Sequence, residues 1–113
     1  MYRKDCITAR DGSDIYLTFY AHASLGISWN GIQVYVDPVG AKYGIEYASE
    51  PKADLILITH QHADHLDVNA VDSLKKDETS VFGSKKCKEK IDCKILSPFQ
   101  QIRYSNIDVK VVP

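Results

Sequence analysis

The stretch Asp54-Leu-Ile-Leu-Ile-Thr-His-Gln-His-Ala-Asp-His65 decides how the rest of this 113-residue chain is interpreted. Its first half is uniformly apolar from Leu55 to Ile58, which is typical of a strand buried on both faces of a sheet. Its second half places three histidines and one aspartate within six positions. In α/β proteins, functional sites lie beyond the carboxyl ends of such strands. The stretch therefore predicts a buried strand that leads directly into a functional loop.

The histidine-rich half is a candidate site for two metal ions. His60 and His62 stand two positions apart, so in an extended chain they point to the same side and can share one cation. Asp64 and His65 follow as the chain curls toward the next element, and they can bind a second cation nearby. Two cations roughly 3.5–4 Å apart can activate a water molecule between them, with Asp64 as a catalytic group that manages protons. The alternative is a polar, solvated loop whose histidines are incidental.

The ligand types also bear on the identity of the metal. Imidazole combined with carboxylate suits zinc, manganese or iron, and the absence of thiolate from the cluster argues against a purely structural zinc site. The three cysteines, Cys6, Cys87 and Cys93, are too few and too far from any histidine to form such a site. They are typical of reduced thiols in a cytoplasmic protein.

The flanking sequence predicts a mixed α/β (α+β) fold. Alternating apolar residues and the Asn30-Gly31 turn indicate antiparallel hairpins before the quoted stretch, whereas strands and helices alternate after it. The expected strands cover residues 7–9, 14–20, 25–29, 32–36, 54–59, 80–82 and 94–96, with helices over 68–76 and 84–90 and a last hairpin over 101–104 and 107–112. Segment 39–52 is expected to be an ordered loop with one helical turn, whose Tyr43 and Tyr47 either line a cleft or cover the sheet edge.

Composition and charge exclude several classes of protein. The chain is 44% hydrophobic and 26% charged with a net charge of −1, which fits one globular domain and gives no electrostatic reason to expect nucleic acid or an anionic membrane as partner. The lysine-rich run from Lys85 to Lys90 is the one hint of a nucleic-acid substrate, and such runs are more often solvated helix faces. The longest apolar stretch, Leu55 to Ile58, is far too short to span a membrane.

At the motif His60-x-His62-x-Asp64-His65 after an apolar strand, the chain resembles the metallo-β-lactamase-fold hydrolases. Two further stretches, Ala21-His-Ala-Ser24 and Val34-Tyr-Val-Asp-Pro38, resemble the branch that contains L-ascorbate-6-phosphate lactonase. The lead-in to His60 and the terminal Val109-Lys-Val-Val-Pro113 fit the same branch. The resemblance implies a four-layer αββα sandwich, two zinc ions with manganese or iron as alternatives, and a metal-activated water that attacks a small lactone or phosphorylated substrate.

The resemblance also implies roles for individual residues. His60 and His62 would bind the first metal, and Asp64 and His65 the second. Three further candidates lie around them and are expected either to support the site or to have ordinary structural roles: His22, Asp37 and Asp67. Asp37 would orient a ligand histidine or simply end a strand, His22 would face the cleft or be a hydrogen-bonded structural residue, and Asp67 would cap the following helix with or without supporting the site.

The chain departs from the family after His65. Family members complete the site with a third histidine for the first metal, a bridging aspartate and a last histidine, whereas no histidine follows His65 here. Residues 1–113 are therefore expected to form one incomplete domain, the N-terminal half of the sandwich, with a mixed, mainly antiparallel sheet and helices on one face.

Three explanations stay open for this departure: a missing C-terminal half, a partner chain that covers the open sheet, or a self-sufficient half-domain. Activity of the chain alone is in doubt, because four ligands spread over two sites bind metal weakly. Two alternative functions follow from these possibilities. The first is a non-catalytic metal-binding or dimerising half-domain, and the second is a phosphodiesterase or nuclease of the same superfamily.

Overall fold

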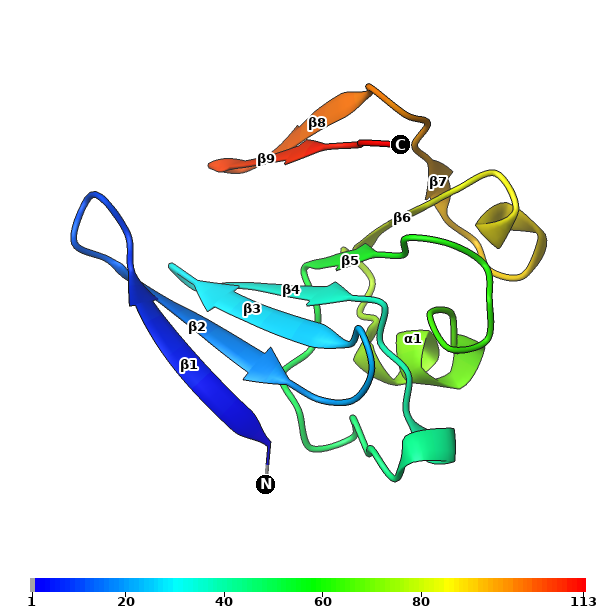
Figure 1. The fold of residues 1–113 in the computed structure, drawn as a ribbon, viewed down its shortest axis with the longest axis horizontal. Coiled ribbons are helices and arrows are strands. Elements are labelled where there is room, and N and C mark those ends of the chain that lie inside the picture. The colour runs from blue at the N-terminus through cyan, green and yellow to red at the C-terminus, as the bar shows by residue number, and fades with distance from the viewer. Residues whose placement is uncertain (1) are drawn as a thin grey trace.

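The computed structural model describes residues 2–113 and contains a seven-stranded mixed sheet whose strands lie side by side in sequence order (Figure 1). The first four strands pair antiparallel and the last three join them in parallel. The strands of this sheet are β1 (Arg3–Thr8), β2 (Asp14–Phe19), β3 (Leu25–Trp29), β4 (Ile32–Val36), β5 (Leu55–Leu57), β6 (Ser80–Gly83) and β7 (Lys94–Ile95).

The antiparallel half confirms the hairpins that were predicted from alternating residues. Strands β3 and β4 are joined by Asn30 and Gly31, which both have positive φ, as a tight two-residue hairpin turn requires. Ile15 pairs with Trp29 across β2 and β3, so their side chains share one face of the sheet. Strand β1 is longer than the short strand predicted near Ile7, and it forms the edge of the sheet.

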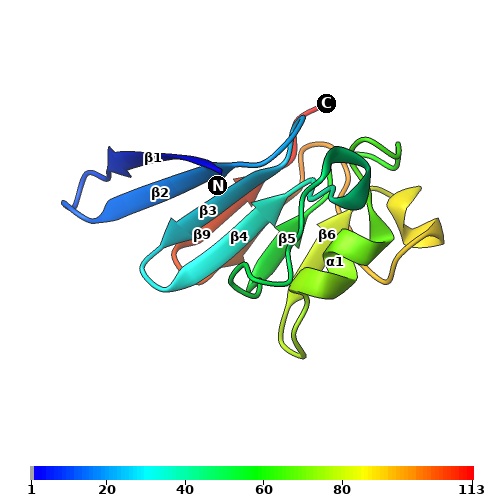
Figure 2. The ribbon, with the colours of Figure 1, turned by 90° about the horizontal axis from the view of Figure 1, so that it is seen from below.

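The parallel half carries the only α-helix of the described residues, α1 (Val68–Leu74), on one face of the sheet (Figure 2). Asp67 caps this helix by accepting hydrogen bonds from the backbone N–H groups of Asn69 and Ala70. The helix packs its buried residues against the sheet, and the cluster that results includes Tyr35, Ile56, Val81, Ala70, Val71 and Leu74. Leu55 and Ile56 on β5 point to opposite faces and are both fully buried, as predicted for this strand.

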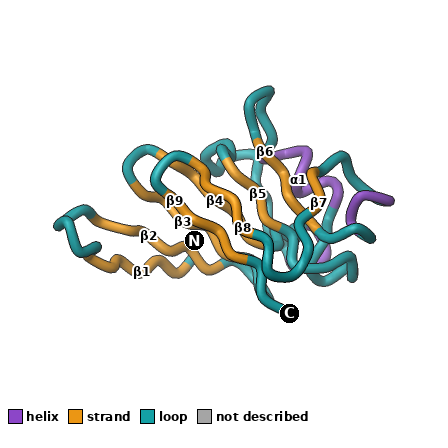
Figure 3. The backbone as a smooth tube through the Cα atoms, turned by 90° about the horizontal axis from the view of Figure 1, so that it is seen from above, coloured by secondary structure: helices purple, strands orange, loops and turns teal. Residues whose placement is uncertain are grey.

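A separate hairpin lies over the opposite face of the main sheet. Its strands are β8 (Gln101–Tyr104) and β9 (Ile107–Lys110), which pair with each other (Figure 3). Both strands alternate between half-buried and exposed residues. The sheet is thus flanked by α1 on one face and by this hairpin on the other (Figures 1 and 2). The predicted fold class, a mixed α/β arrangement with the helix on one face of the sheet, is confirmed.

Several segments differ from their predicted extents. Residues 84–90 were expected to be helical but contain only the 3-10 turn η2 (Cys87–Glu89), because Cys87 is the one buried residue that this lysine-rich turn packs inward. Segment 39–52 contains the predicted helical turn, η1 (Ala41–Tyr43). Tyr47 in this segment is buried and donates a hydrogen bond to the Val39 carbonyl, so it covers the sheet, and it also lines a surface pocket.

Two further observations concern the cysteines and the helices of the described residues. All three cysteines are free, with Cys87 and Cys93 buried and Cys6 exposed. None of the helices in residues 2–113 has the length and apolar character that a membrane-spanning helix needs.

Candidate metal centre

The direction of the strands brings the candidate site residues to one edge of the sheet. Strands β2, β4, β5, β6 and β7 all run in the same direction, so their carboxyl ends meet at that edge. Asp37 follows β4 directly, and residues 59–66, named here the histidine loop, follow β5. Sites in open α/β sheets are typically built at this edge from such loops.

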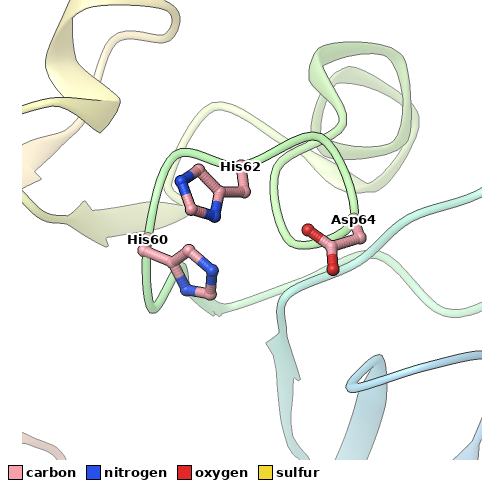
Figure 4. A group of neighbouring side chains, drawn as sticks. All are labelled: His60, His62 and Asp64. Carbon is pink, nitrogen blue, oxygen red and sulfur yellow. The ribbon is translucent and has the colours of Figure 1, made fainter.

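Within the histidine loop, His60, His62 and Asp64 converge (Figure 4). Each offers one ligand atom, and these atoms all lie within 4.8 Å of one another. The loop curls because the backbone N–H groups of His65 and Leu66 both donate hydrogen bonds to the His62 carbonyl. His62 is exposed and the other two are half-buried, so solvent and a small molecule can reach the group.

Asp37 forms hydrogen bonds through its buried side chain with two residues of the histidine loop. Its side chain is 1% exposed and accepts three hydrogen bonds: from the Thr59 N–H at 2.6 Å, the Thr59 hydroxyl at 2.6 Å and His65 Nδ1 at 2.8 Å. Its backbone has a φ of 46°, in the left-handed region that Asp and Asn tolerate better than other non-glycine residues. Asp37 therefore does more than end a strand, because its carboxylate connects β4 to the loop that follows β5.

These hydrogen bonds determine which nitrogen of each histidine is available to a metal. An ionised carboxylate only accepts, so His65 carries its proton on Nδ1 and leaves Nε2 free, 3.6 Å from Asp64 Oδ2. The Thr59 hydroxyl donates to Asp37, so its oxygen can accept from His60 Nδ1 at 3.1 Å. The rings of His60 and His65 lie with their centroids 3.9 Å apart. Both histidines can thus present Nε2 to a cation, as is usual for metal-binding histidines with a supporting acceptor.

The remaining candidates lie away from the converging group. His22 is exposed, has a φ of 51° and packs edge-on against Tyr43 with ring centroids 4.4 Å apart, and its ring makes no hydrogen bond within the described residues. Asp67 caps α1, and its other carboxylate oxygen accepts from the Gly40 N–H at 2.9 Å. Neither belongs to the group of possible ligands found in the described part of the chain.

Thr59 is a residue of the hydrogen-bond network around the candidate site that the sequence analysis missed. It contacts Asp37 through both its N–H and its hydroxyl, and it lies beside His60. Its position directly before the first histidine was the one available signal, because a hydroxyl there can reach both the preceding strand and the ligand.

The donor set fits a divalent metal. The imidazoles of His60 and His62 converge with the Asp64 carboxylate, and the His65 imidazole lies beside that same carboxylate. Such nitrogen and oxygen ligands suit zinc, manganese or iron, and no cysteine belongs to the group. Cys87 and Cys93, although both buried, are not part of any group of possible ligands within residues 2–113.

Comparison with known proteins agrees with this site. The family model of the beta-lactamase superfamily domain matches residues 16–113. The chain belongs to the beta-lactamase superfamily. The matched residues cover strands β3 to β9, most of β2 and the whole histidine loop.

Relatives from the superfamily bear names that refer to a metal. A UPF0173 metal-dependent hydrolase of Flavobacterium johnsoniae is 42% identical over 59 residues, which is 49% of this chain and 26% of the relative. One from Bacillus pumilus is 37% identical over 51 residues, which is 43% of this chain and 22% of the relative. The chain thus matches only about a quarter of the length of these curated relatives.

Solved structures extend the similarity to the whole chain. A Parabacteroides distasonis protein whose name places it among metal-dependent hydrolases superposes with a TM-score of 0.90 at 31% identity, covering 100% of this chain and 51% of that one. The metallo hydrolase Igni18 of Ignicoccus hospitalis superposes with a TM-score of 0.56 at 18% identity, covering 79% of this chain and 42% of that one, and shows the shared fold alone. The chain therefore corresponds to about half of the first solved relative.

Proposed function

We propose that this superfamily member contributes half of the active site of a metal-dependent hydrolase. The observation that carries the proposal is the convergence of His60, His62 and Asp64, with His65 oriented beside them by the buried Asp37. A divalent cation held there, zinc above all, would supply a water of lowered pKa and polarise an oxygen of the substrate. Asp64 is half-exposed and lies close to His65 Nε2, so it can accept or release a proton at the solvent side of the group.

For the substrate, we propose a small lactone or phosphorylated compound, as in the lactonase-like branch that the sequence resembles. The support is that His62 is exposed while His60 and Asp64 are half-buried, so that a small molecule can reach the group. We place the protein in the cytoplasm, because its three free cysteines are typical of a reducing compartment.

We further propose that a second structural half completes the site and covers the sheet. The sheet face opposite α1, which the β8–β9 hairpin covers only in part, carries a set of half-buried apolar side chains, which includes Ile15, Leu17, Phe19, Leu25, Ile27 and Trp29. Four candidate ligands also fall short of the coordination that two metals require. The solved relative of about twice the length supports a covalently linked second half, and a partner chain is the alternative.

Metal analysis of the purified chain is the first test. We expect zinc, manganese or iron to bind, and the variants His60→Ala and Asp64→Asn to bind less than the matched control Asp72→Asn, an exposed aspartate on α1. The metal-loaded chain should then be assayed with lactone, phosphomonoester and phosphodiester substrates. Its mass in solution should also be measured, to show whether it associates with a second chain. Metal binding without turnover would favour the non-catalytic half-domain, and no metal binding in any state would refute the proposed centre.

A phosphodiesterase or nuclease reaction is the second candidate, and one observation favours it. The lysine-rich turn at residues 84–90 follows β6, whose carboxyl end lies at the same edge as the histidine loop. Turnover of phosphodiesters that exceeds that of lactones would select this reaction.

A further inference from the structure

One lysine of the run at residues 84–90 contacts the histidine loop directly. Lys90 Nζ donates a hydrogen bond of 2.9 Å to the Gln61 carbonyl, across 29 positions of sequence. Gln61 stands between His60 and His62. We propose that Lys90 is a positioning residue that holds the Gln61 carbonyl of the histidine loop, so that these two histidines face one cation. The proposal rests on the metal centre proposed above.

In the described part of the chain, the other hydrogen bonds of the loop leave the Gln61 carbonyl without a partner. At the start, the Ile58 N–H donates to the Phe82 carbonyl and Thr59 is bound by Asp37. At the end, His65 is bound by Asp37 and by the His62 carbonyl. Within the described residues, the Lys90 ammonium is the one donor to the Gln61 carbonyl. Without it, the Gln61 carbonyl between the two candidate ligands would have no hydrogen-bond partner within the described residues.

The backbone that carries Lys90 is itself firmly held. Its N–H donates to the carbonyl of Cys87, which is fully buried. Cys87 packs against the end of β6 so closely that a Cβ on Gly83 would lie 2.9 Å from the Cys87 Cβ. Strand β6 is the immediate parallel neighbour of β5, which leads into the histidine loop. Lys90 therefore connects the turn that follows β6 to the histidine loop that follows β5, and its own backbone is held in place by Cys87.

The other lysines of the turn have different surroundings. Lys88 donates to the Cys93 carbonyl and faces Asp92, whereas Lys85 and Lys86 are exposed and make no side-chain hydrogen bond within the described residues. Lys86 is thus a matched control for Lys90, because it has the same charge in the same turn without the contact. A general effect of positive charge near the site would appear in both variants, and a positioning effect only in Lys90.

Hydrogen exchange of the 113-residue chain tests the contact without any metal. In Lys90→Met, peptides covering residues 58–66 should exchange at least about three times faster than in the wild type, because one hydrogen bond is lost. Lys86→Met should change this rate less than about twofold, and Lys90→Arg should restore most of the protection, since guanidinium also donates to a carbonyl. The melting temperatures of all three variants should stay close together.

Titration with Zn²⁺ then tests the consequence for the metal. We expect Lys90→Met to raise the Kd roughly three- to tenfold, as follows from the loss of one exposed hydrogen bond, with Lys86→Met near the wild type. Equal behaviour of Lys90→Met and Lys86→Met in both measurements would overturn the positioning role, as would a Lys90→Arg variant as impaired as Lys90→Met. If the wild type binds no metal but Lys90→Met loosens the loop, the positioning stands and the metal centre fails.

Discussion

Replacement of Asp37 by Asn tests whether its carboxylate sets the proton position on His65. Asn tolerates the left-handed backbone at this position, so the change leaves the backbone and the shape of the side chain intact. The amide oxygen must stay against the Thr59 N–H, which can only donate. The amide NH₂ then faces the Thr59 hydroxyl and His65 Nδ1, both of which donated to Asp37. The hydroxyl can rotate to accept, but His65 must move its proton to Nε2.

The expected loss of metal affinity in Asp37→Asn follows from the role of His65 Nε2 as the atom that is free to bind a metal. With a proton on Nε2, His65 can no longer offer that atom to a cation, so we expect metal affinity to fall about 10- to 100-fold, or roughly 1.4–2.7 kcal/mol. Asp37→Ala should instead act mainly on stability. It leaves three donors without an acceptor and puts alanine at a positive φ, which together cost about 4 kcal/mol of unfolding free energy.

Two measurements separate these effects. The ¹⁵N chemical shifts of the His65 ring report which nitrogen is protonated, and Zn²⁺ titration gives the change in affinity. Urea unfolding gives the stability of both variants, and we expect Asp37→Asn to lose less than half of what Asp37→Ala loses. An Asp37→Asn protein that binds Zn²⁺ like the wild type, with the proton still on His65 Nδ1, would refute the reasoning.

Three other predictions concern the neighbouring network, the helix cap and the tyrosines. Thr59→Val removes the hydroxyl between Asp37 and His60 and should weaken Zn²⁺ binding about tenfold in titrations, whereas Thr59→Ser should retain it. Asp67→Ala should cost about 1–2 kcal/mol in urea unfolding through loss of the α1 cap and the Gly40 contact, with Asp72→Ala near the wild type. Burial raises the pKa of Tyr35 and Tyr47 to about 12, so the unfolded chain loses their protons first, and unfolding free energy should fall as pH rises from 10 toward 12. Urea midpoints at pH 9, 10 and 11 check this, and a constant midpoint would contradict it.

The sequence predicted the structure best where a local sequence pattern is compatible with only one type of local structure. Asn30-Gly31 between alternating strands predicted a tight hairpin, and Asp67 before Val68, Val71 and Leu74 predicted the start of α1. The buried character of β5 followed from the run of residues Leu55–Ile58, because uninterrupted apolar residues leave neither face for water.

Contacts between segments that are distant in sequence could not be predicted from local sequence patterns. The spacing of the histidines indicated a metal site, but the hydrogen bonds of Asp37 with Thr59 and His65 depend on the parallel pairing of β4 and β5. The lysine run was expected to be a solvated helix face, since charge periodicity alone does not reveal that Lys90 reaches Gln61. The proposed pairing of Asp64 and His65 at a second metal stays a prediction.

The order of the strands has a consequence for how the chain folds as it is synthesised. The antiparallel pairs β1–β2, β2–β3 and β3–β4 join strands that are close in sequence, whereas the parallel pairs β4–β5 and β5–β6 join segments that are more distant in sequence. Contacts of low sequence separation form rapidly, and folding during synthesis begins with the N-terminal elements. Strands β1 to β4 can therefore form a template on the ribosome to which β5 and β6 add in turn. The histidine loop can acquire its contacts with Asp37 and Lys90 as soon as those residues have been translated.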